Sequence, residues 1–569
     1  MSSSSTASTQ PAMGTAPAAV ALNVRRPSAG ALWQMTAALV WLPQAALLAW
    51  AVQRMADGQG VAQIWPMAAG VLALGLLRAW MDAHGGWLAN RAARGQLSNL
   101  RAQVVQALGS ASPLDKARAA SGQAASAVAE QAEAIVPWLA RYQSAMWRVR
   151  ILPLAIVAAV GSQSWIAALI LIVAAPLIPL FMAIVGWRAK AASEEQMVQL
   201  GEMNAFLLDR LRGLSTLRAL QAVELTGQRL RAHAEDLRAR TMRVLRIAFL
   251  SSAVLELFSA LGVAMVAVYI GFHLLGTLNF GARGDKLSLG QSMFVLLLAP
   301  AFFEPLRDLS AVWHDRASGE AALQTLQEMQ TQSVEIVGAV DYQKSEHEVI
   351  VIPGLLRVFD LNVQAPGALS RLAPVSLTVQ PAEHVALWSP SGSGKSLLLA
   401  QIAGLLPVQQ GRIEIDGQIL DAQTAPALRS RMAWMSQQPH VFSGSVARNI
   451  ALGNAAISAE QIARATQLAQ LDETLAPRAG MSLGEGGSGL SGGEVVRLAL
   501  ARLAVQTHAD LLLVDEPTAH LDPVTAAQIA QSLRQLSKGR TLLVATHDAQ
   551  LAAAMDRVIE LPTLQEQAA

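Results

Sequence analysis

A glycine- and serine-rich run that ends in Lys395 and Ser396 is the segment best suited to phosphate chemistry. Apolar stretches at 385–388 and 397–406 flank it and predict a strand before it and a helix after it, around the loop Ser389-Pro390-Ser391-Gly392-Ser393-Gly394-Lys395-Ser396. Backbone N–H groups and a helix N-terminus would then face a bound anion. Lys395 would neutralise phosphate charge, and Ser396 would place its hydroxyl on Mg²⁺. Taken alone, the loop could also be an ordinary turn.

Two neighbouring carboxylates follow a second apolar run. Asp515 ends the stretch 511–515, which predicts a buried strand, and Glu516 comes next. Asp515 is placed to coordinate Mg²⁺, and Glu516 to act as the general base for water, which requires a partly desolvated position. A structural role for buried acids after a strand is the alternative.

Four further motifs, together with the phosphate loop and the paired carboxylates, occur in an order that resembles the ABC ATPase family over about 345–560. They are Gln437 in WMSQQP, the segment Leu490–Glu494, Asp522 in AHLD and His547 in VATHD. The resemblance implies that Gln437 contacts Mg²⁺ and the attacking water, and that His547 contacts the γ-phosphate. It also implies that each ATP lies between the phosphate loop of one subunit and the signature of another, so that a dimer is required. The corresponding signature and D-loop residues here are Ser491, Gly492, Gly493 and Asp522.

Long apolar runs precede this ATPase region and predict six membrane-spanning helices. Each is long enough to cross about 30 Å of hydrocarbon, and they lie near 31–52, 62–83, 137–160, 164–187, 247–275 and 288–313. Basic residues near the span ends, such as Arg91 and Arg188, predict that both long loops and both termini are cytoplasmic.

The paired spans and long cytoplasmic loops resemble the exporter-type ABC transmembrane domain. The resemblance implies short coupling helices near Pro113–Lys116 and Leu208–Gly213, although these could be plain solvated connectors. The expected fold is thus a six-helix membrane domain fused to an α/β ABC nucleotide-binding domain. The expected divisions are a disordered cytoplasmic tail, the membrane domain, a linker and the ATP-binding domain, at 1–30, 31–315, 316–345 and 346–569.

Composition agrees with a membrane protein and excludes other classes. Hydrophobic residues make up 53% of the 569 residues and charged residues only 15%, against about 25% charged in soluble domains. A net charge of +2 gives no reason to expect a nucleic-acid partner. The absence of cysteine excludes disulfides and thiolate chemistry in this chain.

The fifth and sixth spans carry a closer resemblance. The segments 240–281 and 298–322 are similar to the CydD family of bacterial CydDC exporters. This implies a heterodimer with a CydC-like half-transporter in the bacterial inner membrane, and a role in cytochrome bd assembly. Cysteine and glutathione are the substrates implied, with haem as the competing proposal.

Three positions depart from the common ABC pattern. Ser389 replaces the first glycine of the phosphate loop, where a Cβ could resist the backbone conformation that glycine permits. Ala365 stands where an aromatic usually stacks on adenine, and Glu494 replaces the commoner glutamine. These departures favour two unequal sites in a heterodimer. They also leave open a regulatory half-transporter that binds nucleotide and hydrolyses it weakly, or an exporter of another small amphipathic substrate.

The sixth span carries ionisable residues at helical spacing. Glu304, Arg307, Ala311 and His314 are predicted to share one face. Arg307 could bind a substrate carboxylate or a haem propionate, His314 could ligate haem iron, and Arg78 could contribute from the second span. The alternative is that Arg307 and His314 only mark the cytoplasmic end of the helix.

Overall fold

The chain folds into two compact units in the computed structural model. The first comprises Met1–Gln103 and Gly122–Gln327, and the second Val104–Ser121 and Glu328–Ala569. The structure describes residues 27–115, 117–119, 121–176, 180, 206–207, 210, 213–278, 280–282, 286–331, 333–339, 354–364, 372–472, 482–484 and 489–561. Most of the predicted tail, most of Leu208–Gly213 and the whole stretch around Ala365 lie outside these residues.

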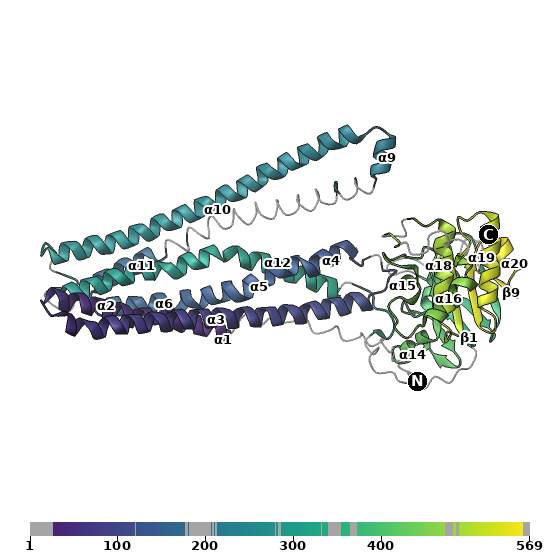
Figure 1. Cartoon of the computed structure of the whole chain (residues 1–569), viewed down its shortest axis with the longest axis horizontal. Coiled ribbons are helices and arrows are strands. Elements are labelled where there is room, and N and C mark those ends of the chain that lie inside the picture. The colour runs from purple at the N-terminus through teal and green to yellow at the C-terminus, as the bar shows by residue number, and fades with distance from the viewer. Residues whose placement is uncertain are drawn as a thin grey trace, which may run out of the picture. The chain divides into compact units, whose positions relative to one another are not determined.

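The first unit is built from long helices (Figure 1). In chain order, and including those that run into the second unit, its helices are α1 (Ala29–Leu39), α2 (Trp41–Ala56), α3 (Val61–Ser110), α4 (Ser121–Ala129), η1 (Gln131–Ala134), α5 (Ile135–Pro137), η2 (Trp138–Tyr142), α6 (Gln143–Gly161), α7 (Trp165–Ala174), α9 (Leu214–Ala219), α10 (Val223–Leu274), α11 (Leu289–Ala311) and α12 (Trp313–Thr331).

Five stretches of described helix are long and apolar enough to cross a membrane, and they coincide with five of the six predicted spans. The predicted fourth span, 164–187, begins as α7, and of its positions 177–187 only 180 is described. Several helices outrun the apolar segments, because polar residues propagate a helix that has already formed. Thus α3 continues to Ser110, well past the predicted span 62–83.

The helix that contains the predicted sixth span is interrupted once, at Val312. Helix α11 ends at Ala311, Val312 leaves the helical geometry with φ −101° and ψ 7°, and α12 begins at Trp313. Helix α12 then occupies the stretch from 316 to Thr331, which the sequence suggested as linker. The predicted face of Glu304, Arg307, Ala311 and His314 is therefore interrupted, and His314 belongs to α12.

The helices of the first unit pack through a continuous apolar cluster. Phe302 and Phe303 on α11 are at most 2% exposed and lie with α6, α7 and α10 in this cluster. Gly262 on α10 is needed there, because a Cβ would come within 2.4 Å of the Phe303 ring.

The described residues of the second unit form two sheets. The five-stranded sheet is parallel, in the order β6-β7-β8-β3-β9, and the four-stranded sheet is antiparallel, in the order β2-β1-β4-β5. The strands are β1 (Leu356–Leu361), β2 (Val375–Val379), β3 (His384–Trp388), β4 (Arg412–Ile415), β5 (Gln418–Ile419), β6 (Met432–Met435), β7 (Leu511–Asp515), β8 (Thr541–Thr546) and β9 (Arg557–Glu560).

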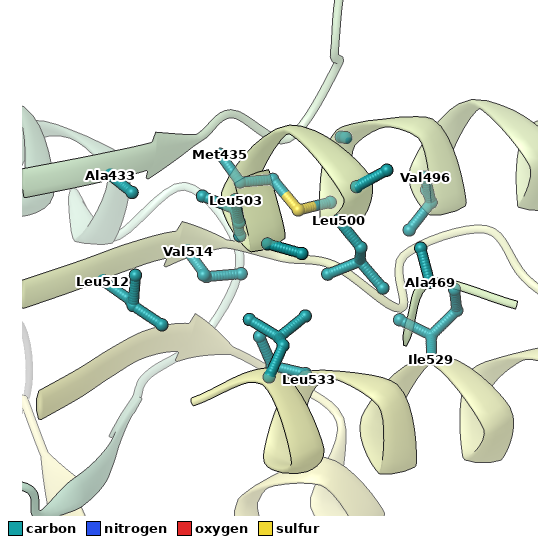
Figure 2. Packing of buried hydrophobic residues seen from close by; sticks show 14 of the residues in the cluster. Ala433, Met435, Ala469, Val496, Leu500, Leu503, Leu512, Val514, Ile529 and Leu533 are labelled. Carbon is teal, nitrogen blue, oxygen red and sulfur yellow. The ribbon is translucent and has the colours of Figure 1, made fainter. Parts of the chain in front are cut away.

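Helices cover the parallel sheet and bury its central strands. They are α13 (Lys395–Ile402), α14 (Ala425–Ser430), α15 (Val446–Ala451), α16 (Ala459–Leu468), α18 (Gly492–Val505), α19 (Pro523–Leu536) and α20 (Ala549–Ala553). Every residue of β7 and β8 is buried, as expected for continuous apolar runs in a parallel sheet. Figure 2 shows Leu512 and Val514 of β7 packed with Leu500, Leu503 and Leu533 of α18 and α19.

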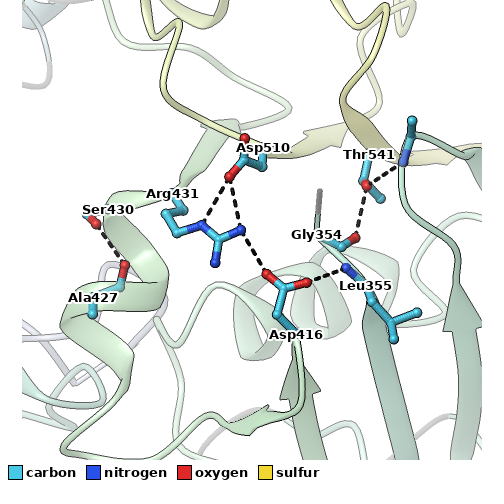
Figure 3. Close-up of polar contacts among 9 residues, drawn as sticks. Gly354, Leu355, Asp416, Ala427, Ser430, Arg431, Asp510 and Thr541 are labelled. Carbon is cyan, nitrogen blue, oxygen red and sulfur yellow. Dashed lines mark hydrogen bonds and ion pairs between the residues drawn. The ribbon is translucent and has the colours of Figure 1, made fainter. Parts of the chain in front are cut away.

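A partly buried charge cluster links the two sheets (Figure 3). Arg431 contacts Asp416 at 2.8 Å and Asp510 at 3.0 Å, and the Leu355 N–H donates to the other Asp416 oxygen at 2.7 Å. Asp416 lies between β4 and β5, whereas Asp510 immediately precedes β7. The cluster therefore fixes the antiparallel sheet to the start of the central parallel strand.

Candidate active site

The parallel sheet gathers the predicted catalytic residues at one edge. Its registers pair Met435 with Val514, Asp515 with Ala545, and Trp388 with Thr546. The carboxyl ends of β6, β7, β8 and β3 are therefore neighbours, as expected for a site in an open parallel sheet. Residues that follow these four strands are Gln437, Glu516, His547 and the phosphate loop.

Glu516 is the centre of this arrangement. Its carboxylate accepts a hydrogen bond from Gln437 Nε2 at 2.9 Å and lies 3.3 Å from His547 Nδ1 and 3.6 Å from Lys395 Nζ. Its side chain is only 9% exposed. A partly desolvated carboxylate among polar groups has the position that a general base for water requires.

The phosphate loop has the conformation predicted from its glycines. Gly392 and Gly394 have φ values of 75° and 122°, which favour glycine, and α13 begins at Lys395. The buried Lys395 ammonium donates to the carbonyl oxygens of Ser389 at 2.6 Å and Pro390 at 3.1 Å. Its position inside the loop is suited to a cation that would bind phosphate oxygens.

Ser389 does not strain this loop. Its φ is not in the left-handed region, so the glycine that the family usually has is not needed for the backbone here. The Ser389 side chain is 2% exposed, and within the described part of the chain its hydroxyl has no hydrogen-bond partner. The sequence-based expectation of a resisting Cβ therefore finds no support in the backbone.

The side-chain oxygens of Asp515 and Ser396 are together suited to bind Mg²⁺. Burial raises the pKa of the Asp515 carboxyl, and the hydrogen bond from Ser396 partly opposes that rise. The second carboxylate oxygen, Oδ1, is buried and makes no hydrogen bond to any described residue. Carboxylate and hydroxyl oxygens are ligands that Mg²⁺ prefers, and bound charge would offset the cost of burying the carboxylate.

The signature segment forms the N-terminus of α18. Ser491 Oγ accepts from the Glu494 N–H at 3.3 Å, while the Glu494 carboxylate accepts from the Ser491 N–H at 2.6 Å. This reciprocal pair is a capping box, which either glutamate or glutamine can complete. Gly492 and Gly493 occupy the first two positions of the helix.

The D-loop aspartate caps a different helix. Asp522 accepts from the N–H groups of Val524 and Thr525 at 3.1 and 3.0 Å at the start of α19. Hydrogen bonds from Thr525 lower the pKa of its carboxyl. Asp522 is therefore an ionised cap at neutral pH.

Two polar residues of this edge had no predicted role. Thr518 Oγ1 donates to Asp548 Oδ2 at 2.8 Å, and Asp548 caps α20 by accepting from Gln550 and Leu551. This bond ties the segment after Glu516 to the segment after His547. Because both residues come just after β7 and β8, the sequence could have suggested that they lie at the active-site edge of the sheet.

The residues predicted to contact substrate have different surroundings in the first unit. Arg307 forms an ion pair with Glu256 of α10 at 3.1 Å, and His314 is exposed on α12. Arg78 instead stacks over the Trp41 ring at 5.3 Å and lines a cavity of about 340 Å³ with Gln34, Asp82, Arg148 and Glu304. Among the residues described, no group of three or more His, Asp or Glu side chains could hold a metal ion.

Comparisons with known proteins agree with this site and fold. The ABC transporter family model matches residues 372–519, and the model of the ABC transporter transmembrane region matches residues 35–306. Among solved structures, a bacterial Atm1-family ABC exporter with ATP bound is similar, with a TM-score of 0.75 at 21% identity, covering 94% of this chain and 92% of that one. The chain therefore belongs to the ABC transporter family, as an ATP-hydrolysing exporter with a fused membrane domain.

Its similarity to curated relatives is more specific. The chain is 35% identical to the CydD glutathione/L-cysteine transport protein of Escherichia coli, over 83% of this chain and 80% of the relative. It is 35% identical to CydD of Haemophilus influenzae, covering 80% and 77%, and 34% identical to the transport ATP-binding protein AarD of Providencia stuartii, covering 84% and 81%. These relatives make the chain a CydD-like ABC exporter, and the predicted family is confirmed.

Proposed function

We propose that this chain pairs with a CydC-like half-transporter in the bacterial inner membrane and exports a small zwitterionic thiol such as cysteine or glutathione. The names of the CydD relatives support the substrate, and a CydC relative from Bacillus subtilis, 29% identical over 92% of this chain, supports the kind of partner. The predicted orientation places both termini in the cytoplasm. The membrane domain would span 31–315 and the ATP-binding domain 346–569.

In the proposed ATP cycle, Glu516 takes the proton from the attacking water. Gln437 and His547 orient the water and the γ-phosphate, and their contacts with Glu516 support these roles. Mg²⁺ would be held by Ser396, Asp515 and Gln437. ATP phosphates would be bound by Ser391, Gly392, Ser393, Gly394 and Lys395, with Ser491, Gly492, Gly493 and Asp522 serving the site of the partner subunit.

The proposed thiol substrate is supported mainly by the charged residues of the cavity beside Arg78. Arg78, Asp82 and Glu304 all lie within predicted membrane spans, yet none makes an ion pair with another described residue. Unpaired ionisable groups at membrane depth are costly, and they usually face a substrate path. The fourth charge, Arg148, is 3.6 Å from Asp308.

The charges of the cavity match a zwitterion. Arg78 offers a cation to a carboxylate, whereas Asp82 and Glu304 offer acceptors to an ammonium group. Haem brings carboxylates and no ammonium group, so the two acids would oppose it. His314, the proposed haem ligand, does not line this cavity.

His84, just after the predicted second span, packs among tryptophan rings. Its ring lies 5.4 Å from Trp80, 5.5 Å from Trp33 and 5.9 Å from Trp87. Packing among three indoles gives this histidine a structural role within the α1–α3 contact.

The test is the substrate-stimulated ATPase of the assembled pair with cysteine, glutathione or haem added. Asp82→Asn combined with Glu304→Gln should raise the cysteine concentration for half-maximal stimulation about tenfold, because the ammonium group loses its partners. The same double variant should improve stimulation by haem if haem is the substrate, because repulsion is removed. That second outcome would replace the thiol with haem.

Arg78→Gln should weaken stimulation by cysteine by a similar factor. Arg54→Gln is the matched control, since Arg54 also stacks over a tryptophan, Trp50 at 4.7 Å, and does not line the cavity. Equal behaviour of the two variants would remove Arg78 from the substrate site.

A further inference from the structure

A short segment after α12 pairs with the loop that follows α3. The Ser112 N–H donates to the Val334 carbonyl at 2.7 Å, and the Ile336 N–H donates to the Ser110 carbonyl at 2.9 Å. Between these bonds, Ala111 faces Glu335 as an antiparallel bridge. We name residues 334–338 the bridge segment.

Asp115 fixes this pairing from inside the loop. Its Oδ2 accepts from the Val334 N–H at 2.8 Å, and its Oδ1 accepts from the Ala117 N–H at 2.9 Å. Ala111, Ser112 and Asp115 are all at most 9% exposed. A buried carboxylate that accepts two backbone N–H bonds makes a defined junction rather than a loose connector.

The other end of the bridge segment is bound to the ATP-binding fold. The Val337 N–H donates to the Gly404 carbonyl at 2.9 Å, and Arg429 donates to the Val337 carbonyl at 2.8 Å and to the Gly404 carbonyl at 3.1 Å. Gly404 lies just past the C-terminal end of α13, whose first residue is Lys395. One guanidinium thus joins the bridge segment to the helix of the phosphate loop.

Close backbone packing leaves little freedom at this contact. Gly338 has φ 70°, and a Cβ there would lie 2.7 Å from the Ala422 carbonyl oxygen and 2.8 Å from Pro426 Cδ at the start of α14. Val337 also packs against the apolar cluster of the ATP-binding fold. Hydrogen bonds and packing together bind both ends of the five-residue segment.

We propose that the bridge segment transmits nucleotide-dependent movement of α13 to α3 within one chain, and that Arg429 is the positioning residue for this transmission. Nucleotide binds at the N-terminus of α13, and Arg429 holds the bridge segment at its other end. The loop at Ser110–Ser112 is the direct continuation of α3, which is also a predicted membrane span. The loop after α3 also contains Asp115 of the predicted coupling segment Pro113–Lys116, so the bridge segment and Arg429 add to that segment a connection to α13. The proposal does not depend on the identity of the substrate.

The absence of cysteine in this chain allows a direct measurement. Ala79→Cys places a single thiol on α3 at the cavity beside Arg78. In the assembled transporter with Arg429 intact, trapping with ATP and vanadate should change its rate of maleimide labelling about fivefold or more. Unchanged labelling during normal ATP hydrolysis would overturn the proposal.

Arg429→Ala in this background should retain ATP binding and hydrolysis within about twofold and lose the labelling change, since only the transmission is broken. Arg534→Ala, an exposed helical arginine of α19, is the control and should behave as the parent. A full labelling change in Arg429→Ala would overturn the role of Arg429.

A cross-link tests the same proposal without weakening the fold. Ala111 and Glu335 form a non-hydrogen-bonded antiparallel pair, a geometry that accepts a disulfide. Ala111→Cys with Glu335→Cys, carrying the reporter at Ala79, should keep the ATP-dependent labelling change when oxidised, because the bridge moves as one body. A change that is lost on oxidation and restored by reduction would show that the bridge must open, and would overturn the proposal.

Discussion

Glu516 combines an uncommon backbone conformation with the contacts of a catalytic base. Its φ is 44°, a left-handed value that costs a non-glycine residue about 1–3 kcal/mol. The Glu516 N–H donates to the Ala545 carbonyl at 2.9 Å, which holds this conformation from the neighbouring strand. In this conformation the carboxylate contacts Gln437 and His547.

Replacing the Glu516 carboxylate by an amide tests its role as base. Glu516→Gln should lower ATP turnover of the assembled pair by about 100-fold or more, because the amide cannot accept the proton. Nucleotide affinity should remain within a few-fold, measured by fluorescent ATP binding. Glu460→Gln on the exposed first turn of α16 is the control, and turnover equal to that control would assign the base elsewhere.

We expect the buried Asp515 carboxyl to make the stability of the folded protein depend on pH. Burial raises the pKa of its carboxyl, so the folded state holds this proton more tightly than the unfolded state. The protonated Asp515 carboxyl therefore stabilises the folded state at low pH. This contribution is lost as the pH rises from the pKa of the unfolded state through the raised pKa of the folded state. Without Mg²⁺ at neutral pH, Asp515→Asn should stabilise the protein by about 1 kcal/mol.

Thermal unfolding at several pH values checks this effect. The gain from Asp515→Asn should shrink as pH falls through the raised pKa, since the parent carboxyl is then neutral as well. Mg²⁺-dependent ATPase should be lost at all pH values. A variant that is less stable than the parent at neutral pH would contradict this prediction.

At the scale of elements, the capping box explains why Glu494 replaces the commoner glutamine without disturbing α18. Glu494→Gln should change the free energy of unfolding by less than about 0.5 kcal/mol, because both side chains can accept the Ser491 N–H. Glu494→Ala should cost about 1 kcal/mol. Denaturant unfolding measures both, and equal losses would show that the cap contributes nothing.

The cluster in Figure 3 makes a prediction about how the two sheets are joined. Arg431→Met should destabilise the protein by about 3 kcal/mol, because Asp416 and Asp510, which are only 10% and 16% exposed, would lose their cationic partner. Arg412→Met removes a more exposed pair with Glu414 and should cost less than about 1 kcal/mol. Similar losses for the two variants would contradict the importance of burial.

At the scale of the whole molecule, the proposed composite site predicts that this chain hydrolyses ATP only when paired. The purified chain should show less than about a hundredth of the turnover of the chain with its CydC-like partner, because a trans signature is part of the site. Turnover and mass are measured on the same samples. Full activity from a sample shown to be monomeric would exclude the composite site.

Much of the architecture could be predicted from local pattern. Apolar runs of membrane length predicted the spans, since each must satisfy its backbone hydrogen bonds internally and bury its side chains in lipid or protein. The phosphate loop and the catalytic residues after β7 and β8 could also be predicted from the sequence, because parallel strands bring their carboxyl ends to one edge of the sheet. Sequence alone therefore determined the class, the two kinds of domain and the candidate ATP residues.

Tertiary structure decided which polar residues share an environment. The helical spacing of Glu304, Arg307 and His314 predicted one face, but the break at Val312 depends on packing that spacing does not encode. In the structure Arg307 forms an ion pair with Glu256, whereas Arg78 lines a cavity with Asp82 and Glu304. The bridge segment joins residues more than two hundred positions apart through backbone atoms, which every residue carries, so side-chain identity could not have indicated the pairing.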